Sequence, residues 1–159
     1  MGRIRFVLVG KPHSRELEDL YEEYRKKLLK FADVKVEYLK EARLPNRPTE
    51  PQIRRALDEE AETVLKTLDR TDGLVLVDIR GRSQDSQGFA KDLGNLTDRF
   101  ASLFFVIGSS YGLSDNLRAR ADYLWKLSDL TFTHPLALLI SMEQVYRAFK
   151  IIRGETYQK

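Results

Sequence analysis

Two kinds of apolar pattern alternate along the chain, and together they predict one layered α/β domain. Short runs that are apolar throughout or alternate apolar with polar residues predict strands, whereas apolar positions three and four residues apart predict helices. The predicted strands are residues 4–9, 34–39, 74–79, 103–107 and 123–127. The predicted helices are residues 14–29, 49–68, 86–100, a short segment from residue 114, and 134–152. Strict alternation of the two favours a mainly parallel sheet.

Polar and proline residues mark the boundaries between these elements. Ser14, Thr49 and Ser114 each precede a helical pattern and can accept hydrogen bonds from the first free amides of the helix. Residues 40–52 hold three prolines together with Arg43 and Arg47, which predicts a loop. Gly81 is expected to end the third strand.

Three turns that follow predicted strands are candidates for ligand binding. They comprise residues 78–81, 108–113 and 127–134. Glycines let a ligand approach the backbone, and open α/β sheets bind ligands beyond the carboxyl ends of their strands. Ordinary turn chemistry explains any one of these turns better, whereas for three turns on one edge of the sheet ligand binding is an equal alternative. The sequence has neither of the common glycine-rich signatures of nucleotide-phosphate sites.

Composition narrows the possible functions. The 159 residues suit a single domain spanning residues 1–159. There is no cysteine, which excludes a thiolate nucleophile and a cysteine-based zinc site, and with only two histidines no metal is expected. No apolar run approaches the ~18 residues that cross a bilayer. We therefore expect a cytoplasmic protein without a membrane partner.

The end of the chain carries most of the candidate chemistry. The net charge is only +3, yet basic residues gather at Arg147, Lys150, Arg153 and Lys159. This cluster favours a nucleic-acid partner, with a solvated tail as the alternative. His134 could take part in catalysis or simply hold a turn. The last predicted helix is apolar over more than one stripe, which predicts a self-complementary contact between two copies.

The same residues resemble a known family. The segments at 105–113, 127–134 and 143–157 are similar to the small SPOUT-class methyltransferases of the ribosomal RNA large subunit methyltransferase H family. The resemblance covers the whole chain. It implies transfer of a methyl group from S-adenosylmethionine to N3 of a pseudouridine in 23S ribosomal RNA. It also implies the SPOUT α/β-knot fold, in which the C-terminal segment forms a trefoil knot.

Site residues and partners follow from this resemblance by position. The cofactor-binding positions fall at Leu76, Gly81, Gly108, Leu127, Ser128, Leu130, Thr131 and Phe132. The catalytic positions fall at Arg147 and Tyr157. Members of the family are homodimers with a composite active site, and they act on the assembled ribosome without a metal.

Three positions depart from the pattern of the family. Ser109 stands where a glycine is usual, Leu138 where an arginine is usual and Gln158 where a histidine is usual. We expect Ser109 to crowd the cofactor or strain the backbone. We expect Leu138 to remove a clamp on RNA or substrate, and Gln158 to remove an acid–base group. The alternative function is therefore a diverged or engineered knotted dimer that binds cofactor or RNA with little or no turnover.

Overall fold

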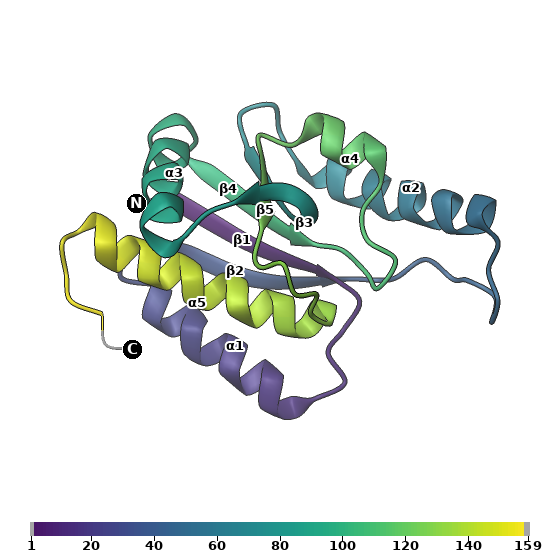
Figure 1. Ribbon diagram of the computed structural model, residues 1–159, viewed down its shortest axis with the longest axis horizontal. Coiled ribbons are helices and arrows are strands. Elements are labelled where there is room, and N and C mark those ends of the chain that lie inside the picture. Colours follow the sequence, from purple (N-terminus) through teal and green to yellow (C-terminus); the bar gives the residue numbers. More distant parts are fainter. Residues whose placement is uncertain (1, 158–159) are drawn as a thin grey trace.

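A five-stranded sheet with helices on both faces forms the frame of the protein (Figure 1), as a computed structural model describes it for residues 2–157. The strands are β1 (Gly2–Val9), β2 (Ala32–Leu39), β3 (Gly73–Ser83), β4 (Ser102–Ile107) and β5 (Tyr123–Lys126). The helices are α1 (Arg15–Leu28), α2 (Glu50–Thr67), α3 (Ser86–Arg99), α4 (Asp115–Arg120) and α5 (His134–Ile152). Neighbouring strands all pair in parallel, in the order β2-β1-β4-β3-β5, which confirms the expected parallel sheet.

Side chains alternate in direction along the strands and so contribute to two hydrophobic layers, one on each face of the sheet. Phe6 of β1 faces the layer under α1, α3 and α5, whereas its neighbour Val7 faces the layer under α2 and α4. The predicted caps are confirmed: Ser14 and Ser114 accept backbone hydrogen bonds of 3.2 and 3.1 Å, and Thr49 forms a capping box. Within residues 2–157, no helix is long and apolar enough to span a membrane.

β3 is longer than the sequence predicts, and Gly81 does not end it. The pairing of β3 with β5 shifts register between Val77 and Arg82 and then continues through Ser83. A Cβ added at Gly81 would lie 2.7 Å from backbone atoms of β5. The backbone therefore passes close against β5 here, in a contact between distant segments that local sequence could not reveal.

Most of the apolar surface of α5 is covered inside the chain. This helix packs against α1, α3 and the sheet. Tyr146 is 9% exposed and lies edge-on to the rings of Tyr24, Phe31 and Tyr157. The width of the apolar stripe is thus explained within one protomer and does not by itself require a second copy. The homodimer stays a prediction.

Candidate active site at the carboxyl edge of the sheet

Three segments expose apolar side chains at the carboxyl edge of the sheet. Residues 78–81 are not the predicted turn but continue β3 through its register shift, whereas the other two segments are the turns that follow β4 and β5. Ile79 is 67% exposed, Tyr111 48% and Leu130 72%. One such side chain comes from each segment, whereas the other apolar side chains of the strands are buried or partly buried. Exposed apolar groups beside polar backbone are typical of ligand-binding edges of α/β sheets.

The residues predicted to bind a cofactor occupy this edge at different depths. Leu76 is fully buried beneath the edge, so its side chain supports the turn from below. Gly108 is buried, whereas Leu130 and Thr131 are exposed. Ser128 accepts a 3.0 Å hydrogen bond from the amide of Leu130 and thereby shapes the last turn. The remaining members of the set, at Gly81, Leu127 and Phe132, are partly buried.

The turn after β4 needs its two glycines for different reasons. A Cβ at Gly108 would lie 2.4 Å from the carbonyl oxygen of Gly112, so the turn closes tightly only without a side chain there. Gly112 has φ of +95° and no atom within 4 Å of an added Cβ. It thus combines a left-handed backbone with open space, where a ligand could approach the main chain.

Ser109 does not strain this turn, so that expectation is wrong. Within residues 2–157, positive φ occurs only at glycines. The Ser109 hydroxyl is buried and donates a 3.4 Å hydrogen bond to Oε1 of Glu60 in α2. The side chain is therefore held by α2.

Glu60 is a site residue that sequence reasoning missed. Its carboxylate is buried and also accepts a 2.9 Å hydrogen bond from the amide of Ala42, so it joins the loop after β2 to the turn after β4. Burial raises the pKa of Glu60, and donation from Ala42 opposes this only in part. One signal was available, because Glu60 occurs among Leu57, Ala61 and Val64 on the apolar face of its helix.

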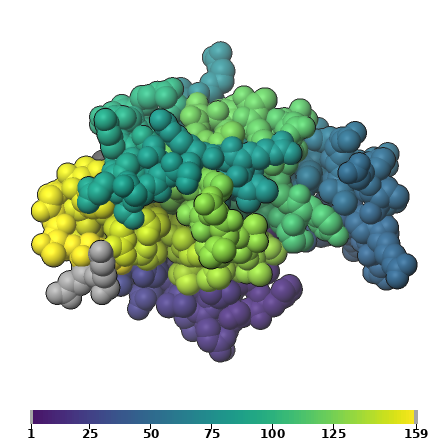
Figure 2. Space-filling model, in the orientation of Figure 1, coloured from purple at the N-terminus to yellow at the C-terminus, as the bar shows by residue number. Residues whose placement is uncertain are grey.

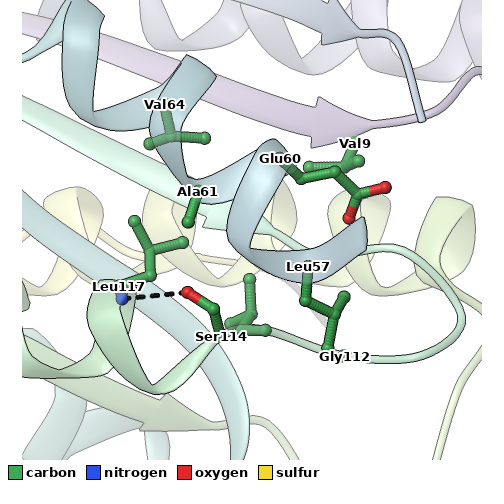
Figure 3. Close-up of a pocket in the computed structure, with 9 residues that line it drawn as sticks. Val9, Leu57, Glu60, Ala61, Val64, Gly112, Ser114 and Leu117 are labelled. Atoms are coloured by element: carbon green, nitrogen blue, oxygen red, sulfur yellow. Dashed lines mark hydrogen bonds between the residues drawn. The ribbon is translucent and has the colours of Figure 1, made fainter. Parts of the chain in front are cut away.

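The packing around Glu60 is close. Figure 3 shows α2 lying against the segment from Gly112 to Leu117, with Ser114 capping α4. The space left between them is about 10 Å³, room for at most about one water molecule. This contact is a support for the turn rather than a ligand site. A larger hollow of about 380 Å³ lies between α1 and β2, and none of the three segments lines it.

We expect Glu60→Gln to change how stability depends on pH. A carboxyl whose folded pKa is raised favours folding below its ordinary pKa of 4.5 and loses that contribution as the pH rises through the folded value. The glutamine variant should therefore gain stability relative to the unaltered chain as the pH rises above 4.5. Urea unfolding at a series of pH values measures this difference. A constant difference across the series would contradict the proposed burial of a titrating group.

Two further polar contacts fix the surroundings of the edge. Asp78 of β3 is buried and accepts hydrogen bonds from Arg118, which ties this strand to α4. His134 begins α5, as predicted, with Nε2 3.7 Å from Oε1 of Glu41. Burial lowers the pKa of His134 despite the opposing carboxylate. This histidine is therefore mainly neutral at pH 7 and connects α5 with the loop after β2.

The two predicted catalytic residues lie together near the end of the chain. Oε2 of Glu143 accepts hydrogen bonds from Arg147 at 2.8 Å, as the spacing predicts, and from the Tyr157 hydroxyl at 2.7 Å. The guanidinium of Arg147 lies 4.2 Å from the centre of the Tyr157 ring. Burial, and then the carboxylate, raise the pKa of Tyr157. Nε of Arg147 is buried and has no hydrogen-bond partner within the described residues.

This pair is distant from the turn after β5 in the same chain. Arg147 lies 13 residues beyond His134 along α5, which corresponds to about 20 Å of helix. The structure therefore brings together the catalytic pair, and separately the cofactor turns, but does not join the two sets through α5. Gln158 lies outside the described residues.

Leu138 is not a surface position. It lies in the second turn of α5 and is fully buried in the layer formed with α1 and α3. The expectation that this residue replaces an arginine facing RNA is wrong, because its side chain belongs to the core.

No metal centre is apparent at this edge. Across residues 2–157, no group of three or more His, Cys, Asp or Glu side chains is arranged to hold a metal ion. The exposed apolar residues and open backbone suit an organic ligand instead.

Known proteins share this sequence along almost its whole length. Residues 2–158 match the family described as "Predicted SPOUT methyltransferase". The chain is 34% identical to a Halothermothrix orenii protein over 158 residues and 38% identical to a Pseudothermotoga lettingae protein over 155 residues. These alignments cover 99% and 98% of both partners, and each relative is named ribosomal RNA large subunit methyltransferase H.

A solved structure supports the fold. A probable rRNA-methyltransferase from Porphyromonas gingivalis superposes with a TM-score of 0.50 at 13% identity. The match covers 96% of this chain and 71% of the other.

Proposed function

Because the chain belongs to the SPOUT methyltransferase family, we propose that it transfers a methyl group from S-adenosylmethionine to ribosomal RNA of the large subunit. The observation that carries this proposal is the carboxyl edge, where three segments each present an exposed apolar side chain and the backbone at Gly112 is open to a ligand. The names of the full-length relatives supply the RNA substrate.

The finer proposal is that the acceptor is N3 of a pseudouridine and that the C-terminal segment forms a trefoil knot. Both rest on the family resemblance. The close packing of Gly81 in β3 against the backbone of β5 supports such an arrangement, because it holds the end of β3 against a later segment of the chain. A 2.9 Å hydrogen bond from Ser86 to Gln144 ties the start of α3 to α5.

The residues at the edge fit S-adenosylmethionine. The adenine ring of this cofactor needs apolar contacts on its faces, which Ile79 and Leu130 can offer, and backbone groups at its edge. The open space beside Gly112 allows such an approach. When bound, the cofactor supplies a methyl group that is already activated by its sulfonium. The protein then contributes mainly position and orientation.

Arg147 and Tyr157 would act on the RNA side. The guanidinium can bind phosphate or orient the base, and its buried Nε donates to no group within residues 2–157. Tyr157 can cover the base with its ring. Because this pair lies about 20 Å along α5 from the turn after β5, we propose that each active site combines the turns of one protomer with the pair of its partner. N3 would gain the methyl group as the bond between the methyl carbon and the sulfur of the cofactor breaks, leaving a neutral thioether, and the N3 proton would pass to solvent.

Mixing two inactive variants tests this composite site. Arg147→Gln should damage the RNA side and Leu130→Arg the cofactor side, so each variant alone should transfer little methyl. In a randomly reassociated mixture half of the dimers are mixed, each with one intact site, so about a quarter of the unaltered activity should return. The transfer of tritiated methyl groups from the cofactor to ribosomes measures the activity of the mixture. A mixture as inactive as its components would show that one chain builds the whole site.

Two measurements test the proposed function itself. Calorimetry with S-adenosylmethionine tests the edge as a cofactor site. Tritium transfer to ribosomes lacking the modification, followed by chromatography of the nucleosides, tests the reaction and the acceptor atom. Binding without transfer would support the alternative of a dimer that binds cofactor or RNA with little turnover. We favour turnover, because Ser109 causes no backbone strain and Leu138 has a structural role.

A further inference from the structure

A strongly basic arm projects from the protein beside the candidate active site. It comprises residues 40–55, the loop after β2 and the start of α2, and Figures 1 and 2 show it extending from the right of the molecule. The arm contains only two acidic residues, Glu41 and Glu50. Its basic residues are all exposed, and they are Lys40, Arg43, Arg47, Arg54 and Arg55.

These cations have no evident role in holding the fold together. Within residues 2–157, none of the four arginines of the arm forms an ion pair with another side chain. Arg54 and Arg55 lie near the amino end of α2, the end at which a helix dipole favours anions. Across the described part of the chain, no packing contact, ion pair or helix-dipole interaction explains these positive charges. The charged side chains are therefore available to bind an external anion.

The base of the arm is attached to the candidate active site. Glu60 accepts hydrogen bonds from Ala42 in the arm and from Ser109 in the turn after β4. Glu41 lies 3.7 Å from His134 at the start of α5. The arm is thus continuous with the edge at which Tyr111 is exposed. Pro45, Pro48 and Pro51 restrict its backbone, which reduces the entropy lost on binding.

We propose that the basic arm binds the phosphate backbone of the RNA whose base is methylated, and so holds that RNA over the carboxyl edge. The inference rests on the proposed function. A row of exposed guanidiniums without internal partners suits phosphates, which accept hydrogen bonds from planar guanidinium groups. The arm thereby adds an RNA contact apart from the C-terminal cluster that contains Arg147.

A pair of charge-matched variants tests the arm. Arg47→Gln with Arg54→Gln removes two charges from it. The control, Lys66→Gln with Arg70→Gln, removes two exposed charges at the other end of α2, where Lys66 lies 12 residues and about 18 Å beyond Arg54 along the helix. The probe is purified bacterial ribosomes that lack the modification. At 0.15 M salt we expect the arm variant to bind about tenfold more weakly and the control to change little.

The salt dependence and the kinetics distinguish the loss of a phosphate contact from a general loss of ribosome binding. Each phosphate contact adds about 0.7 to 0.9 to the slope of log affinity against log salt, so the arm variant should show a slope shallower by about 1.4 to 1.8. In the arm variant, KM for ribosomes should rise, whereas kcat and the affinity for S-adenosylmethionine should stay unchanged. Equal weakening in both variants, or an unchanged slope in the arm variant, would overturn the proposal.

A photo-crosslinker at position 47 identifies what the arm touches. Crosslinking to ribosomal RNA is expected, whereas crosslinking to ribosomal protein alone would overturn an RNA-binding arm. The outcome stays distinct from failure of the proposed function. If the unaltered chain methylates nothing, the methyltransferase proposal fails, and the crosslink and salt slope still decide what the arm binds. If it methylates normally and the arm variant keeps its kcat/KM, only the arm proposal fails.

Discussion

Leu138→Arg should leave most molecules unfolded rather than restore an RNA contact. The side chain is fully buried in the layer that α5 forms with α1 and α3, where a guanidinium would have no partner and no water. Burying an unpaired charge typically costs at least about 4 kcal/mol, comparable to the whole stability of many domains. Urea unfolding followed by circular dichroism measures the loss.

Leu130→Arg is the matched control for this prediction. Leu130 is 72% exposed in the turn after β5, so the same substitution should change the free energy of unfolding by less than about 0.5 kcal/mol. The substitution should still weaken the binding of S-adenosylmethionine. Near-native stability of Leu138→Arg would show that α5 is packed differently from this structure, and would restore position 138 as a candidate RNA contact.

Gly81→Ala should damage both stability and cofactor affinity. The added methyl group would lie 2.7 Å from three backbone atoms of Leu124 and Trp125. Since backbone rather than a flexible side chain must move, we expect a cost near the upper end of overpacking effects, about 3 kcal/mol. Residues 78–81 of β3 would also shift, so calorimetry should show at least about tenfold weaker binding of S-adenosylmethionine.

Gly94→Ala provides the control with the same chemical change. Gly94 lies inside α3, and the nearest atom to its added Cβ is Cδ1 of Ile152 at 3.9 Å. Replacing a glycine inside a helix should stabilise the protein by about 0.5–1 kcal/mol and leave cofactor affinity unchanged. If both alanine variants had the same stability and cofactor affinity, the close contact between β3 and β5 would not be needed for either property.

Sequence was sufficient for features set by local chemistry. Helix caps such as Thr49, the order of the elements and the ion pair of Glu143 with Arg147 depend on residues a few positions apart. The turns after β4 and β5 could be placed for the same reason, since each follows a recognisable strand, whereas the turn predicted at residues 78–81 is wrong because these residues belong to β3.

Features that depend on distant segments were missed or misplaced. The extra length of β3 comes from pairing with β5, about forty residues later, and Glu60 acts on Ser109, about fifty residues later. Leu138 was assigned to the RNA side because family likeness indicates which residue is unusual without showing which way its side chain faces. Its burial depends on α1 and α3, which no window around position 138 contains.

The strand order has a consequence for how the chain reaches this structure. β4 lies between β1 and β3, and Ile4 pairs with Leu103, about a hundred residues away. Closing so long a loop is slow, and parallel sheets built from distant strands fold late. Until residues 102–107 have been synthesised, β1 and β3 each keep an unpaired edge with apolar side chains. We therefore expect an incomplete chain, in which these strand edges are unpaired, to aggregate more readily than the complete one.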